Sequence, residues 1–209
     1  MRSAWRGKTI GRTLSNHYIE QKCASLRGKV LDIAGGATPG YVKLLPISIE
    51  LVRTDLAEAD GVVAMDFNKP LPFPDNTFES VLLFNALYAV EKPLDLAREV
   101  RRVLKPGGTW LILSPFIANE MPEPHDYRRY THEGLMNLLH TAAFEDVVID
   151  RLGDRVAAAV QLLHPLFLFR FIRGLIFPLA ILLDRAIPAR TRTLHPAPVS
   201  YGVSARKSP

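Results

Sequence analysis

The chain has 209 residues, of which 48% are hydrophobic and 22% charged, and this is enough to bury one substantial core. Its single cysteine, Cys23, excludes an internal disulfide framework. The basic first residues lead into no apolar stretch, so we expect no secretory signal, a cytoplasmic location and a single domain over 1–209.

The formal net charge of +5 is unevenly distributed along the chain. Residues 1–149 carry 17 basic and 18 acidic side chains, a balance of −1, whereas residues 150–209 carry 9 basic and 3 acidic ones, a balance of +6. A basic patch often binds nucleic acid. Here the arginines alternate with a long apolar run, which favours an anionic membrane surface instead, and we expect no nucleic-acid partner.

Short apolar runs alternate with segments of helical periodicity along the chain. The runs predict strands at 29–34, 48–55, 61–66, 78–85, 108–115, 144–150 and 198–207, and the periodic segments predict helices at 18–26, 93–104 and 131–142. This alternation predicts an α/β fold with a doubly wound, mostly parallel sheet that binds ligands at the carboxyl ends of its strands. Residues 56–60 are too few for a helical crossover, so a loop should join the second and third strands.

The stretch "VLDIAGGATPGY" at 30–41 places an acid and two glycines at the end of the first predicted strand. A dinucleotide fingerprint needs G-x-G-x-x-G, and aligned on Gly36 its three positions read Ala34, Gly36 and Pro39. A P-loop fits this stretch less well still, because no Gly-Lys-Ser/Thr follows. The turn therefore favours neither a nucleotide-dependent oxidoreductase nor an NTPase.

Five segments in order resemble the class I S-adenosylmethionine-dependent methyltransferases, and specifically the type 11 methyltransferases. These segments are "VLDIAGG", "VRTDL", "AMDFNKPLPFPDNTFESVLLFNAL", "AREVRRVLKPGGTWLILSPF" and "EPHDYRRYTHEGLMNLLHTAAFEDVVI". The resemblance covers roughly residues 18–150 and implies a Rossmann-like sheet and methyl transfer from S-adenosyl-L-methionine. Two family features differ, because Ala34 and Thr38 replace motif glycines and "LYAV" at 87–90 stands where many members carry a Glu-His pair.

The resemblance also implies which residues bind the cofactor. Asp55 would accept hydrogen bonds from the ribose hydroxyls, Asp66 would receive the adenine amino group, and the backbone of Phe67 would meet the adenine ring. Asn85 would hold the methionine amino group through its carbonyl. The full predicted cofactor set is Asp32, Ala34, Gly35, Gly36, Asp55, Asp66, Phe67 and Asn85.

The loop "EPHDYRRY" at 123–130 follows the fifth strand and should overhang the cofactor. Methyl transfer from a sulfonium needs a base only when the acceptor must lose a proton. His125 is the candidate base because its ordinary pKa lies near neutrality, and Asp126 would orient it. The histidines show no metal-ligand spacing, so we expect no metal site.

An apolar segment at 156–190 separates the sixth strand from the last one. Its longest run without charge is 14 residues, whereas a membrane-spanning helix needs about 20. We expect helices broken near Pro165 and Pro178 that form a lid, a membrane-surface contact or a partner contact. The expected activity is methyl transfer to a small lipophilic acceptor, and the alternative is a catalytically degenerate subunit that docks through this segment.

Overall fold

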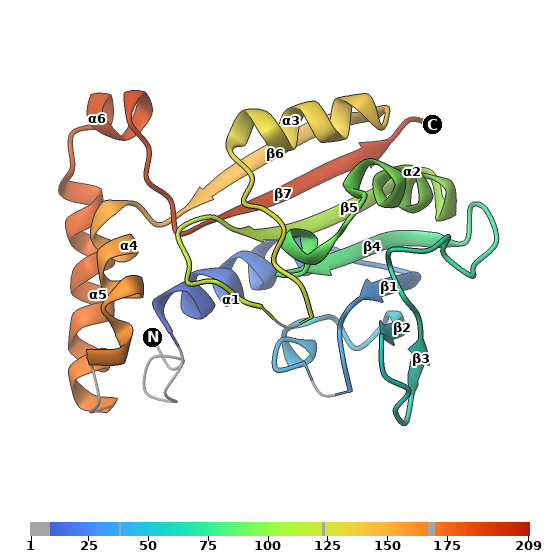
Figure 1. Ribbon diagram of the computed structural model, residues 1–209, viewed down its shortest axis with the longest axis horizontal. Coiled ribbons are helices and arrows are strands. Elements are labelled where there is room, and N and C mark those ends of the chain that lie inside the picture. The colour runs from blue at the N-terminus through green and yellow to red at the C-terminus, as the bar shows by residue number, and fades with distance from the viewer. Residues whose placement is uncertain (1–8, 38, 123, 167–169) are drawn as a thin grey trace.

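The computed structural model describes residues 9–37, 39–122, 124–166 and 170–209. Seven strands form one sheet in the order β3-β2-β1-β4-β5-β7-β6, with helices packed on both faces (Figure 1). The strands are β1 (Lys29–Ile33), β2 (Glu50–Asp55), β3 (Val62–Ala64), β4 (Phe78–Phe84), β5 (Leu104–Pro115), β6 (Phe144–Leu152) and β7 (Ser200–Lys207). The helices are α1 (Ile10–Cys23), α2 (Pro93–Val103), α3 (His132–Thr141), α4 (Arg155–Leu162), α5 (Arg170–Ala186) and α6 (Ala189–Leu194).

The sheet is parallel from β3 to β5 and becomes antiparallel at its far side. β1 pairs in parallel with both β2 and β4, and β4 pairs in parallel with β5. β7 runs antiparallel to both of its neighbours, β5 and β6. The predicted α/β, mostly parallel sheet is therefore confirmed, and the chain order makes β1 and β4 neighbours at the point where the winding reverses.

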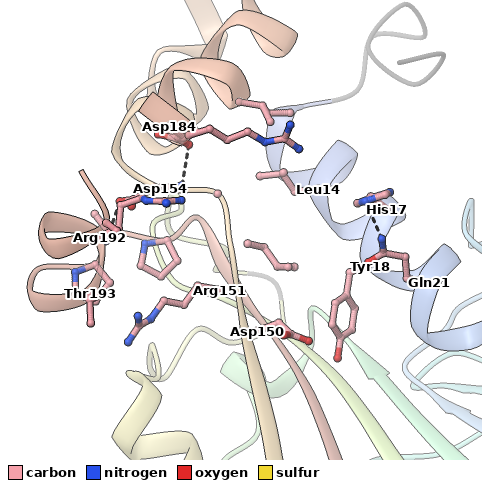
Figure 2. Close-up of a pocket in the computed structure, with 18 of the residues that line it drawn as sticks. Leu14, His17, Tyr18, Gln21, Asp150, Arg151, Asp154, Asp184, Arg192 and Thr193 are labelled. Atoms are coloured by element: carbon pink, nitrogen blue, oxygen red, sulfur yellow. Dashed lines mark hydrogen bonds between the residues drawn. The ribbon is translucent and has the colours of Figure 1, made fainter. Parts of the chain in front are cut away.

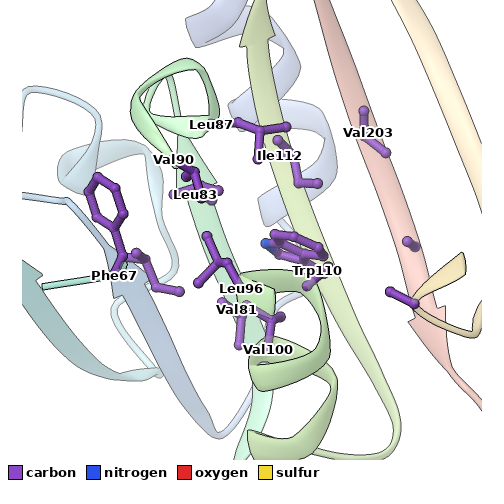
Figure 3. Packing of buried hydrophobic residues seen from close by; sticks show 14 of the residues in the cluster. Phe67, Val81, Leu83, Leu87, Val90, Leu96, Val100, Trp110, Ile112 and Val203 are labelled. Carbon is purple, nitrogen blue, oxygen red and sulfur yellow. The ribbon is translucent and has the colours of Figure 1, made fainter. Parts of the chain in front are cut away.

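Alternate residues along the strands are buried in two hydrophobic cores on opposite faces of the sheet. On one face, Val30 and Leu82 pack with Tyr18 and Cys23 of α1. The other core is larger and lies under α2 and α3. Figure 3 shows part of this second core, where Leu96 and Val100 of α2 lie with Val81, Leu83, Trp110 and Ile112 of the strands. The period-two alternation of a strand with two buried faces fixes this arrangement.

Local signals account for most element boundaries, with two differences from the sequence prediction. Thr131 accepts a hydrogen bond from Gly134 N and caps α3, as expected. The first helix starts at Ile10 rather than at residue 18, because Thr9 caps it by accepting a hydrogen bond from Arg12 N. The fifth strand begins at Leu104 rather than at residue 108, with a shift of register between Phe78 and Ser80 of β4.

Two connections at the β1–β3 side of the sheet are short. Residues 56–61 join β2 to β3 without a helix, as the sequence predicts. Between β1 and β2 the described residues form only a three-residue 3₁₀ turn, η2 (Val42–Leu44). At this side of the sheet, loops therefore take the place of the helices that usually connect neighbouring strands of a doubly wound fold.

Helices α4, α5 and α6 form a separate layer at one end of the molecule, away from β3 (Figure 1). α4 ends at Leu162, just before Pro165, so a break near this proline is confirmed. The predicted break near Pro178 is wrong, because α5 continues through it. Phe177 and Ala180 on either side of the proline are buried in a small third core with α4 and Ile10, and this packing offsets the one backbone hydrogen bond that proline removes.

Candidate functional site

The carboxyl ends of β1, β2, β3 and β4 bring the predicted cofactor residues to one edge of the sheet. Asp32 is in register with Arg53 of β2 and Leu82 of β4, and Asp55 is in register with Ala64 of β3. Two backbone bonds join the segments beyond the strands, from Gly35 N to Thr54 O at 3.0 Å and from Met65 N to Asp55 O at 2.7 Å. These bonds hold the segments that follow β1, β2 and β3 next to one another at the carboxyl end of the sheet.

The turn after β1 needs glycine because two carboxylates lie against it. A Cβ at Gly35 would lie 2.3 Å from Asp32 Oδ2, which no side chain tolerates. Gly36 has a φ of +67°, and a Cβ there would lie 3.0 Å from Asp55 Oδ2 with no other heavy atom within 4 Å. Ala34 also adopts a positive φ, of 60°, at a position where the family usually has glycine. The altered motif thus keeps the open turn at the cost of backbone strain at Ala34.

Asp32 is buried at the base of this turn. Its exposed fraction is 0%, and both carboxylate oxygens accept from the Tyr41 hydroxyl at 2.9 and 2.8 Å. Burial raises the pKa of Asp32 to about 7, although the Tyr41 hydrogen bond and the nearby Arg53 act in the opposite direction. In this arrangement Asp32 holds the turn in place through Tyr41, and its direct contact with the cofactor stays a prediction.

Tyr41 is a site residue that sequence reasoning missed. It bonds Asp32 and packs edge-to-face on Phe84, with ring centroids 5.2 Å apart. It also lines a cavity of about 320 Å³, which we call the edge cavity. The edge cavity lies between the start of α1, the 39–41 loop and the ends of β4 and β5, and its lining includes Tyr41, Asn85, Pro115, Ile117, Ala118, Met121 and Gln161.

Of the remaining predicted cofactor residues, Asn85 lines the edge cavity, whereas Asp55, Asp66 and Phe67 are not part of its lining. Asn85 lines the edge cavity itself, with its backbone N–H bound to Leu113 O at 2.8 Å. Asp55 accepts from Leu56 N through Oδ1, and Oδ2 accepts no hydrogen bond from the described residues. Asp66 accepts from Asn68 N at 2.9 Å. The Phe67 side chain is buried in the core, so only its backbone can meet a ligand.

The predicted catalytic pair is not a pair in the structure. Asp126 binds the guanidinium of Arg129 through both oxygens and accepts from Met121 N at 2.8 Å. The Arg129 hydrogen bond holds the pKa of Asp126 below its usual range. Among the described residues no hydrogen bond joins Asp126 to His125. The His125 side chain is exposed and stacks on Tyr127, with ring centroids 5.2 Å apart. The expectation that Asp126 orients His125 is therefore wrong, because Asp126 instead fixes the segment that carries Met121 into the edge cavity.

A second and larger cavity, of about 630 Å³, lies away from the predicted cofactor residues. We call it the lateral cavity; it is bounded by α1, the end of β6, α5 and α6 (Figure 2). Figure 2 shows Arg151 and Arg192 on one side of it and Tyr18 and Gln21 of α1 on the other. No sequence motif indicated this cavity, because its walls come from segments far apart in the chain.

The described residues of the apolar segment at 156–190 form α4, α5 and the start of α6. No helix within the described parts of the chain is long and apolar enough to cross a membrane. The segment instead touches the candidate site directly, because Gln161 of α4 lines the edge cavity and accepts from Gly11 N at 3.0 Å.

Comparison with known proteins agrees with the arrangement of the sheet edge. Residues 34–112 match the model of the family described as "Methyltransferase domain". The ubiquinone/menaquinone biosynthesis C-methyltransferase UbiE of Pasteurella multocida is 35% identical over 112 residues, which cover 44% of this chain and 42% of that protein. The corresponding protein of Cellvibrio japonicus is 31% identical over 137 residues, which cover 56% and 52%. The chain thus spans about half the length of the curated relatives it matches.

Solved structures show the same fold at low sequence identity. A SAM-dependent methyltransferase from Archaeoglobus fulgidus superposes with a TM-score of 0.63 and 18% identity, covering 94% of each chain. The phosphoethanolamine N-methyltransferase 2 of Haemonchus contortus, solved in complex with S-adenosyl-L-methionine, gives a TM-score of 0.63 and 14% identity, covering 93% of this chain and 52% of that one. Residues 34–112 thus match a methyltransferase domain, and the chain as a whole shares the fold of these solved methyltransferases.

Proposed function

We propose that this protein transfers a methyl group from S-adenosyl-L-methionine to a small lipophilic acceptor. The observation that carries the proposal is the open turn at Gly36, which faces Asp55 Oδ2, an oxygen that accepts no hydrogen bond from the described residues. Relatives named as C-methyltransferases of ubiquinone and menaquinone biosynthesis support an acceptor of quinone-like, apolar character.

The residues at the sheet edge fit this cofactor. The space beside Gly36 lets a ligand approach the backbone N–H groups, and Asp55 Oδ2 is available to accept from the two ribose hydroxyls. Asp66 and the backbone of Phe67 follow on the neighbouring strand end and would recognise the adenine. Asn85, at the end of β4, would hold the amino acid end next to the edge cavity. When bound, the cofactor supplies an activated methyl on a sulfonium.

The edge cavity would receive the acceptor. Pro115, Ile117, Ala118 and Met121 give it an apolar wall, whereas Asn16 and Gln161 supply hydrogen-bonding groups on the other side. Alignment of the acceptor with the methyl provides most of the acceleration for such a displacement. His125 remains the proposed base for an acceptor that must lose a proton, acting from the exposed loop without the help of Asp126.

Calorimetric titration with S-adenosyl-L-methionine tests the cofactor half of the proposal. We expect the protein to bind it, and we expect Asp55→Ala to weaken binding by about 1.5–3 kcal/mol, as for loss of hydrogen bonds to a charged group. Asp95→Ala on α2 is the matched control, since this acid is exposed and meets only Arg98 at 3.8 Å. Absence of binding by the folded protein would favour the degenerate, docking subunit over the enzyme.

Turnover with a quinone-like acceptor tests the catalytic half. We expect His125→Ala to lower kcat about 10²-fold, the usual contribution of general base catalysis, while the Kd for the cofactor stays the same. Normal turnover by this variant would give the loop a purely structural role and leave the methyl transfer itself intact.

A further inference from the structure

Helix α5 is apolar on two opposite faces. Phe177, Ala180 and Asp184 are 1%, 2% and 6% exposed and face the interior. Leu175, Leu179 and Leu182 follow one another at helical spacing on the other side and are 74%, 49% and 61% exposed. A helix that is apolar all round is normally covered on every side, so the outer face, which we call the leucine face, has the composition of a contact surface.

The surface around the leucine face is cationic. Residues 156–198 contain five arginines and only one carboxylate, Asp184. That carboxylate is turned inward, where its oxygens accept from the backbone N–H groups of Asp154, Val156 and Ala157. No acid of this segment therefore balances the exposed Arg185, Arg190 and Arg192.

We propose that α5 and α6 dock the protein on an anionic membrane surface. The leucine face would enter the boundary between headgroups and acyl chains, and the exposed Arg185, Arg190 and Arg192 would meet the headgroups. A second copy of the chain on this face would set arginines against arginines, whereas an anionic bilayer complements both the charge and the apolar area. This inference goes beyond the proposed methyl transfer and does not depend on it.

The lateral cavity offers a place for an anionic headgroup beside the docked helix. Arg151, Arg185 and Arg192 line it (Figure 2), and within the described part of the chain none of the three forms an ion pair with a carboxylate. The acids of the same cavity already have partners: Asp150 pairs with Lys22 at 3.0 Å, and Asp154 and Asp184 accept hydrogen bonds from backbone N–H groups. The net field of the cavity favours a phosphate group.

Docking would also bring the candidate active site close to the bilayer. α4 packs on α5, and its Gln161 lines the edge cavity. An acceptor dissolved in the membrane would then reach the edge cavity over a short path, a consequence that rests on the proposed function while the docking itself does not.

Co-sedimentation of the full chain with vesicles tests the proposal. We expect binding to vesicles of phosphatidylcholine with phosphatidylserine to be at least about tenfold stronger than binding to phosphatidylcholine alone, and to weaken as salt is raised. Cofactor binding, measured in the same preparation, reports on the methyltransferase proposal separately.

Two variants, each with a matched control, separate the apolar and the electrostatic contributions. Leu175→Glu/Leu182→Glu should reduce vesicle binding at least about tenfold, whereas Ile47→Glu, at an exposed apolar residue of a distant loop, should leave it unchanged. Arg190→Glu/Arg192→Glu should have a similar effect, whereas Lys92→Glu/Arg98→Glu makes the same change of charge at exposed positions near and on α2 and should have little.

Several outcomes would overturn the docking proposal. Wild-type protein that binds neither kind of vesicle would do so, as would binding that both double variants retain. A wild-type dimer by light scattering that Leu175→Glu/Leu182→Glu converts to a monomer, without vesicle binding, would assign the leucine face to a second copy instead.

Discussion

Two buried carboxylates, one at the sheet edge and one in the helical layer, stabilise their surroundings in different ways. Asp32 accepts from a side-chain hydroxyl, that of Tyr41, and its environment is apolar enough to raise its pKa to about 7. Asp184 accepts from three backbone N–H groups at the start of α4, including the capping residue Asp154. The positive end of a helix compensates a buried charge, whereas a single hydroxyl does not.

The largest expected effect that separates the two acids is a pH dependence at Asp32. A group whose folded pKa is raised, from 3.8 to about 7, stabilises the fold at low pH and loses that contribution as pH rises from about 4 to 7. Asp32→Asn cannot ionise and so does not lose this contribution. As pH rises from 4 to 8, the free energy of unfolding of the variant should therefore increase relative to that of the wild type by up to about 4 kcal/mol. Chemical denaturation at several pH values measures this, with the exposed Asp95→Asn as the control. Parallel curves for wild type and Asp32→Asn would show that Asp32 titrates normally.

The next largest effect concerns Asp184. Asp184→Ala leaves three N–H groups at the start of α4, two of them buried, without their acceptor, and we expect the free energy of unfolding to fall by about 3 kcal/mol or more. Because the acid lies in the helical layer, amides of α4 and α5 should exchange faster while those of β4 and β5 stay protected. Hydrogen exchange read by mass spectrometry makes the distinction, with the neighbouring Arg185→Ala as control. Uniform loss of protection would mean that the two regions unfold as one.

The smallest effect is expected for Tyr41→Phe. This change removes only the hydroxyl that donates to Asp32. We therefore expect the free energy of unfolding to fall by about 1–2 kcal/mol near pH 8, where the acid is ionised, and by less near pH 5. The pKa of Asp32 should rise further, because the Tyr41 hydrogen bond now lowers it. Carbon-detected NMR titration of the Asp32 carboxyl follows that shift, and an unchanged pKa would contradict the assigned bond.

The sequence was sufficient for the strands and for the edge at which they place Asp55, Asp66 and Asn85. Those features follow from local alternation and from the rule that parallel strands end together. The hydrogen-bond partner of an individual acidic side chain was harder to predict from the sequence. Asp126 hydrogen-bonds Arg129, three residues away, and not its neighbour His125, because a bidentate guanidinium is the stronger partner.

Long-range contacts set the features that the sequence did not reveal. Tyr41 reaches Asp32 only because the chain after Gly36 turns back over the end of β1. The N–H groups that donate to Asp184 lie 27 to 30 residues earlier in the chain, and no periodic pattern in the sequence predicts a contact between residues so far apart. Pro178 gave a local signal for a break, and packing of Phe177 and Ala180 overrode it.

The short connection after β1 bears on which nucleotides the turn can accept. In folds that bind dinucleotides, a helix begins at this turn and its N-terminus attracts the pyrophosphate. Here the described residues between β1 and β2 hold only the 3₁₀ turn Val42–Leu44. A phosphate at Gly36 would therefore gain no helix dipole and would lie against Asp55. Ribose hydroxyls at Asp55 meet no such repulsion, so we expect the turn to favour an adenosine without phosphate groups over a phosphorylated one.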